Sequence, residues 1–176
     1  MPALPPIPSW QAIHPLIVHF PIALLLVAPL FIAIGAARKP ERSYPFLLAG
    51  LILMTLGTVS AFVAVWSGEA SGPIAESAPR VKAALERHEE LAENTEVLFS
   101  ALTFVFAAIL FVPRLLKREP VRAISTVLPL VFLVLYATGA VSLANAAHEG
   151  GRLVHELGVR APMPAGAAAP VTARRE

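Results

Sequence analysis

The hydrophobic and polar positions divide the chain into four long apolar stretches separated by short charged segments. The first 37 residues contain no charged side chain, and three later runs are uncharged or nearly so. A transmembrane helix needs about 20 mostly apolar residues. The pattern therefore predicts four membrane-spanning helices, at about residues 13–37, 44–66, 94–116 and 122–147.

The segment before the third apolar stretch has a helical period. Between Val81 and Thr95, apolar positions recur every three or four residues, and Lys82, Glu86 and Glu90 fall on the opposite face. We expect one helix over about residues 79–116 whose first turns extend beyond the bilayer. The predicted fold is all-α, an antiparallel four-helix membrane bundle with an extramembrane extension of the third helix.

The sequence predicts one domain over residues 1–160, with no apparent internal repeat, followed by an extended or disordered tail over 161–176. Proline lacks the N–H that a helix needs, but neighbouring helices in a bundle can satisfy the freed carbonyls. We therefore expect kinked spans, and we expect Tyr136 and Asn145 to form interhelical hydrogen bonds. The prolines concerned are Pro15, Pro21, Pro29 and Pro129.

Composition and charge agree with a membrane protein. Hydrophobic residues make up 56% of the chain and charged residues only 15%, against about 25% charge in soluble domains. Seven of the 14 basic residues lie in two short segments after the first and third spans, which the positive-inside rule places in the cytoplasm. Both termini are then periplasmic, in a bacterial inner membrane. The basic residues form no stripe with aromatic residues, so we expect lipid and not nucleic acid as the partner.

All five histidines fall in the outer half of this topology. His14 and His19 open the first span, His88 lies on the apolar face of the third helix, and His148 and His155 follow the fourth span. Histidine at membrane depth favours a function, and imidazole ligates haem iron, zinc and copper. We assign no catalytic residue and expect His155 to be exposed. The candidate cofactor or metal ligands are His14, His19, His88 and His148.

Small and acidic residues near these histidines allow more than one interpretation. A stripe of small residues along the second span either permits close helix packing or leaves a slot for a haem ring. Gly150 and Gly151 are expected to end the last helix. Glu89, Glu93 and Glu149 either support the ligands or belong to a solvated face. The stripe consists of Gly50, Gly57, Ala61, Ala64 and Gly68.

Two motifs resemble a known family. The segment HPLIVHFPIAL begins at His14, and AHEGGRLVHELGV runs from residue 147 to 159. Both are similar to signatures of the bacterial membrane family catalogued as domain of unknown function 2231, and the resemblance covers about residues 10–160. It implies a compact four-span module found joined to or near Rieske-type and cytochrome proteins, with His14, His19 and His148 as family positions. His155 stands where the family has tyrosine.

Three functions remain open. The first is an electron-transfer module that binds b-type haem through the outer histidines and passes electrons between quinol and a periplasmic redox protein. The second is a non-catalytic accessory subunit, with no cofactor, of a larger respiratory or photosynthetic membrane complex. The third is a Zn or Cu site in the same histidine layer. The chain has no cysteine, GxxxxGK[ST], HExxH or GxSxG motif, so we expect an electron-transfer or accessory subunit rather than an autonomous enzyme.

Overall fold

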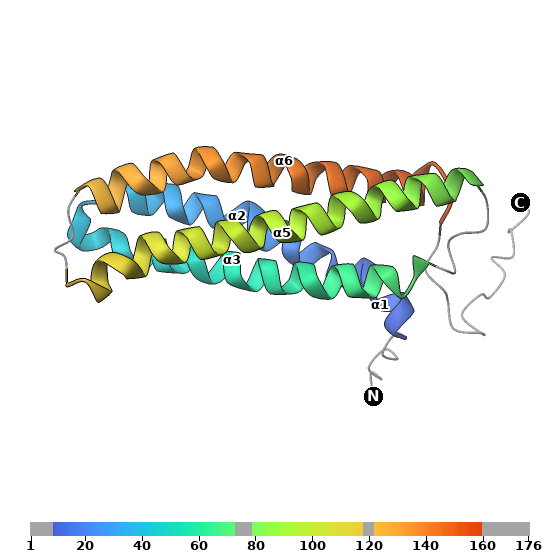
Figure 1. The fold of residues 1–176 in the computed structure, drawn as a ribbon, viewed down its shortest axis with the longest axis horizontal. Helices are drawn as coiled ribbons and strands as arrows, with labels where there is room; N and C mark the ends of the chain where they lie inside the picture. The colour runs from blue at the N-terminus through green and yellow to red at the C-terminus, as the bar shows by residue number, and fades with distance from the viewer. Residues whose placement is uncertain (1–8, 73–78, 118–121, 160–176) are drawn as a thin grey trace, which may run out of the picture.

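The computed structural model describes residues 9–72, 79–117 and 122–159, and its regular elements over these ranges are all helical. In chain order they are α1 (Trp10–Ile17), α2 (His19–Ala36), α3 (Pro40–Glu69), α5 (Pro79–Leu115), the π-helical turn η1 (Ala123–Val127) and α6 (Leu128–His155). The long helices α2, α3, α5 and α6 form an antiparallel bundle, with α1 and η1 continuing α2 and α6 (Figure 1). Within these described ranges four helical units are long and apolar enough to cross a membrane, which confirms the predicted fold.

The two segments with clustered basic residues lie at the same end of the bundle. They follow α2 and α5, whereas α3 ends and α5 begins at the opposite end (Figure 1). We call this opposite end the histidine end, because it holds His14 and His88. Which end faces the cytoplasm stays a prediction from the charge pattern.

Helix α5 contains 37 residues and so is about 55 Å long at 1.5 Å per residue. A bilayer core is only about 30 Å thick, so the first turns of α5 extend beyond it, as the sequence predicts. In this extension Val81 and Leu85 pack against Leu153 of α6 in a small apolar cluster of their own. The predicted tail, residues 161–176, lies outside the described residues.

Pro29 leaves the carbonyl of Leu25 without its helical partner, because proline has no N–H to donate. The hydroxyl of Tyr136, buried in α6, donates to that carbonyl at 2.5 Å. The predicted interhelical hydrogen bond of Tyr136 is confirmed. Asn145, the other residue expected to bond across helices, has an exposed side chain.

A second proline, Pro129, lies at the start of α6. It cannot donate to the carbonyl of Ser125, which lies in η1, where the backbone widens into a π-helical turn. The hydroxyl of Ser43 in α3 donates to this carbonyl at 3.3 Å. At both prolines a side chain from another helix therefore replaces the missing backbone donor, as expected inside a membrane bundle.

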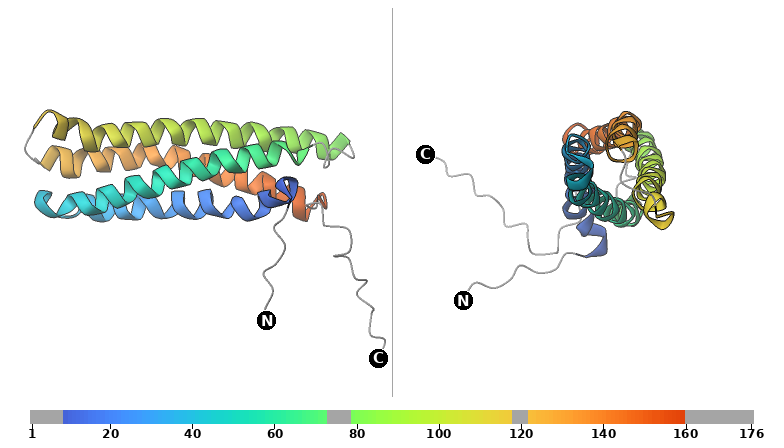
Figure 2. Two further views of the ribbon diagram at one scale, coloured as in Figure 1. Left: turned by 90° about the horizontal axis from the view of Figure 1, so that it is seen from below. Right: turned by 90° about the vertical axis from the view of Figure 1, so that its left-hand side faces the viewer.

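The bundle consists of two similar halves, the hairpins α1–α2–α3 and α5–α6. The buried positions of α2 match those of α5 after a shift of 74 residues, which takes His14 to His88, and those of α3 match those of α6 after a shift of 82. Seen end-on, α2 lies opposite α5 and α3 opposite α6 (Figure 2, right). The halves are thus related by a pseudo-two-fold axis along the bundle, a repeat that the sequence analysis did not detect. Identical residues at matched positions include Gly57 with Gly139, Ala64 with Ala146, and Gly68 with Gly150.

Matched glycines also allow the helices of each hairpin to pack closely. A Cβ at Gly57 would lie 2.7 Å from Cδ2 of Leu25, and one at Gly139 would lie 2.8 Å from Cδ1 of Leu102. A Cβ at Gly50 would lie 2.7 Å from Cγ1 of Ile32 in α2. In the middle of the bundle the small-residue stripe of α3 therefore serves close packing, one of its two expected uses.

Candidate functional site

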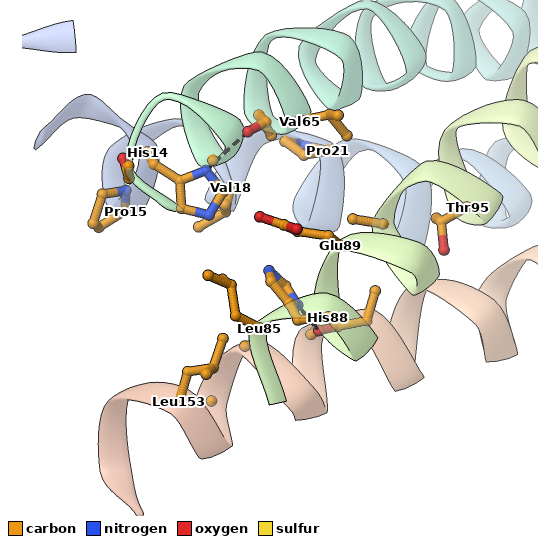
Figure 3. Close-up of a pocket in the computed structure, with 18 of the residues that line it drawn as sticks. His14, Pro15, Val18, Pro21, Val65, Leu85, His88, Glu89, Thr95 and Leu153 are labelled. Atoms are coloured by element: carbon orange, nitrogen blue, oxygen red, sulfur yellow. Dashed lines mark hydrogen bonds between the residues drawn. The ribbon is translucent and has the colours of Figure 1, made fainter. Parts of the chain in front are cut away.

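The rings of His14 in α1 and His88 in α5 face each other across a cavity at the histidine end (Figure 3). Their centroids are 6.5 Å apart and their planes are inclined by 81°. Nδ1 of His14 lies 2.8 Å from the carbonyl oxygen of Ala64, and Nδ1 of His88 lies 3.0 Å from that of Ala146. A carbonyl only accepts, so Nδ1 carries the proton in both rings and Nε2 of the neutral imidazole keeps a free lone pair. The second nitrogen of each ring points into the cavity (Figure 3).

A glycine lies against each of these rings. A Cβ at Gly68 would lie 3.1 Å from Cε1 of His14, and a Cβ at Gly150 would lie 2.9 Å from Cε1 of His88. Each glycine comes four residues after the carbonyl that accepts the Nδ1–H bond. Each hairpin therefore supplies the same three parts, a histidine, a carbonyl on the adjacent helix and a glycine one turn later. The pseudo-two-fold axis passes between the two rings.

The cavity between the histidines has a volume of about 460 Å³, within the range of about 300–1,000 Å³ that is typical of ligand and cofactor pockets. Its lining is mostly apolar and includes many small residues, contributed by all four membrane-spanning units. The carboxylate of Glu89 also points into it (Figure 3). The site therefore has room for a mainly apolar ligand with a few polar contacts at fixed places.

His14 lies just before a break in the first span. The helix is interrupted at Val18, between α1 and α2. Pro21 cannot donate a hydrogen bond to the carbonyl of Ile17, so one helical bond across this junction is missing. The predicted kink is confirmed here. Before this break α1 packs against α3, where Nδ1 of His14 meets the carbonyl of Ala64.

The structure brings together two of the four predicted ligands. His19 contributes to the cavity lining but has an exposed side chain, and His148 is exposed and lies outside the lining. The reason is helical geometry at about 100° per residue. His19 is about 140° around the helix from His14, and His148 precedes Gly150 by two residues. Within the described ranges no group of three or more His, Cys, Asp or Glu residues could hold a metal ion. The expected layer of four is thus a pair.

The expected end of the last helix at Gly150 and Gly151 is wrong. Helix α6 continues to His155, and the backbone reaches a positive φ of 70° only at Gly158. Gly150 serves instead as the surface on which the ring of His88 rests, whereas a Cβ at Gly151 would meet nothing within 4 Å. His155 is exposed, as predicted.

A buried carboxylate lies on the turn of α6 that contacts His88. Glu149 is only 6% exposed. Its Oε1 lies 3.3 Å from Nε of Arg87, and its Oε2 lies 2.8 Å from Nη1 of Arg152. The matched position of α3 is Ser67, whose hydroxyl lies 3.2 Å from Nδ1 of the other histidine. The sequence predicts Glu149 as a possible support but does not point to Arg87 or Ser67, whose positions become meaningful only when the two hairpins are aligned.

Comparison with known proteins agrees with the resemblance of the two motifs. The model of a family described as "Predicted membrane protein (DUF2231)" matches residues 11–162, which include both histidines and all four spans. Neither the curated proteins nor the solved structures give a match to the chain. The chain therefore belongs to the family of predicted membrane proteins described as domain of unknown function 2231.

Proposed function

We propose that this protein is a membrane electron-transfer module that binds one b-type haem between His14 and His88. The supporting observation is the spacing of the two imidazoles. Haem iron takes its axial ligands from the protein, and two histidines suffice. A metal bound by an imidazole nitrogen lies about 2 Å from it, hence about 3 Å from the ring centroid, so two axial rings have centroids roughly 6 to 6.5 Å apart. The observed separation is 6.5 Å.

The donor set favours haem over the Zn or Cu site that the sequence left open. Zinc sites take three or four ligands from the protein, whereas the described residues offer no group of three possible ligands. Haem needs only two because its own ring supplies the rest. The apolar lining of the cavity and its volume of about 460 Å³ also suit a flat organic ring better than a hydrated ion.

The residues around each histidine fix the ring in a ligating orientation. The Nδ1–H bonds to Ala64 and Ala146 select the tautomer with a free Nε2 and strengthen that nitrogen as a donor. Gly68 and Gly150 leave the space that each ring needs. Bound haem would supply one-electron redox chemistry, and the chain's own part is to hold it and to limit its contact with water.

We further propose that the site faces the outer, periplasmic side of a bacterial inner membrane. The basic turns lie at the opposite end of the bundle, which the positive-inside rule assigns to the cytoplasm. His88 precedes Leu115 by 27 residues, about 40 Å along α5, so it lies at or beyond the outer edge of a hydrocarbon core about 30 Å thick. A quinol in the membrane as electron donor and a periplasmic redox protein as acceptor fit this position.

Absorbance spectroscopy and iron analysis test the proposal on protein purified in detergent from haem-replete cells. We expect a Soret band and one iron per chain in the wild type and in His19→Ala and His148→Ala. We expect His14→Ala and His88→Ala to lose both signals. A colourless wild-type protein, or a band that survives both of the last two substitutions, would refute the assignment. The accessory-subunit role stays a prediction of the sequence.

A further inference from the structure

We propose that Glu149 acts through His88 and makes the two histidines unequal ligands, with His88 the stronger electron donor. This inference rests on the proposed haem function. Glu149 lies three residues after Ala146, which accepts the Nδ1–H bond of His88, and one residue before Gly150, on which the ring rests. The carboxylate thus shares one turn of α6 with both contacts of the ring.

Because Glu149 is buried, its charge is less screened by water and salt than an exposed charge. It is the only buried charged side chain in the described part of the chain. The side chains of its two partners, Arg87 and Arg152, are 68% and 39% exposed. Water and salt screen exposed charges more strongly than buried ones, so the charge of Glu149 is screened less than the charges of its two partners. The pair with Arg87, the residue before His88, also ties this turn of α5 to α6.

The matched position in the other half of the site carries no charge. Ser67 occupies the position that matches Glu149, and its hydroxyl lies 3.2 Å from Nδ1 of His14. The otherwise symmetric arrangement therefore places a neutral group beside one histidine and a carboxylate beside the other. Negative charge on the N–H side of a ligating imidazole strengthens its donation and favours the oxidised, more positive iron.

Redox titration of purified holoprotein tests this inference with three variants. Glu149→Gln should shift the oxidised–reduced equilibrium of the haem, at a fixed ambient potential, toward the reduced form by about threefold to tenfold. Arg152→Gln, which leaves the carboxylate less compensated, should shift it the opposite way. The control is Glu156→Gln, because Glu156 also pairs with Arg152 at 3.1 Å but is exposed. This variant should stay within about twofold of the wild type.

The outcomes separate this inference from the haem proposal. A wild-type protein without a Soret band overturns the proposed function itself. If the wild type holds haem, a Glu149→Gln protein that loads less haem but keeps the wild-type potential shows a purely structural role and overturns the inference. If Glu149→Gln fails to load haem at all, the Arg152→Gln shift decides, and its absence overturns the inference.

Discussion

Replacing Gly150 with alanine should displace the ring of His88. The new Cβ would lie 2.9 Å from Cε1, whereas ordinary contacts begin at 3.4 Å. The ring must therefore move by about 0.5 Å, at a cost of about 1–3 kcal/mol for overpacking. The higher helix propensity of alanine offsets about 1 kcal/mol of this cost. The movement also strains the 3.0 Å bond from Nδ1 to Ala146, so haem affinity should fall about 10- to 100-fold.

Gly151→Ala is the matched control, because a Cβ there would meet nothing within 4 Å. We expect this variant to gain up to about 1 kcal/mol of stability and to bind haem like the wild type. Haem titration followed at the Soret band measures affinity, and thermal unfolding in detergent measures stability. Equal haem affinity in Gly150→Ala and Gly151→Ala would show that the ring of His88 does not need the space at Gly150.

Two further predictions concern the carbonyls to which a proline cannot donate. Tyr136→Phe removes the donor to Leu25 and should destabilise the protein by about 1–2 kcal/mol in detergent unfolding. Adding Pro29→Ala restores a backbone donor, so the double variant should recover most of the loss; no recovery would contradict the explanation. Ser43→Ala removes the longer bond to Ser125 and should cost about 0.5–1 kcal/mol in the same assay; an unchanged stability would argue against that bond.

The membrane fold is predictable from the sequence because its signals are local. Apolar stretches about 20 residues long and clustered basic turns can be read without knowing which helices touch. The helix predicted over residues 79–116 runs from Pro79 to Leu115. Helix ends at glycine are less predictable. Glycine often ends a helix, but at Gly150 the helix continues and the missing side chain makes room for the ring of His88.

The histidine pair could be predicted only in part from the sequence. All four candidates, His14, His19, His88 and His148, lie near the histidine end, and the side of the helix distinguishes them. At about 100° per residue His19 lies about 140° from His14, but the carbonyls that accept the Nδ1–H bonds of His14 and His88 lie on other helices and cannot be identified from the residue types. The repeat was hidden because the two shifts, 74 and 82 residues, differ, and no single period aligns both helices of a hairpin.

The duplicated architecture has a consequence for assembly. Each hairpin contributes one imidazole of the pair, so neither can complete the pair alone. The site comes into existence only when the two inserted hairpins dock side by side along the pseudo-two-fold axis. A metal bound by both histidines would then cross-link the two halves, and its retention would indicate that the hairpins have docked.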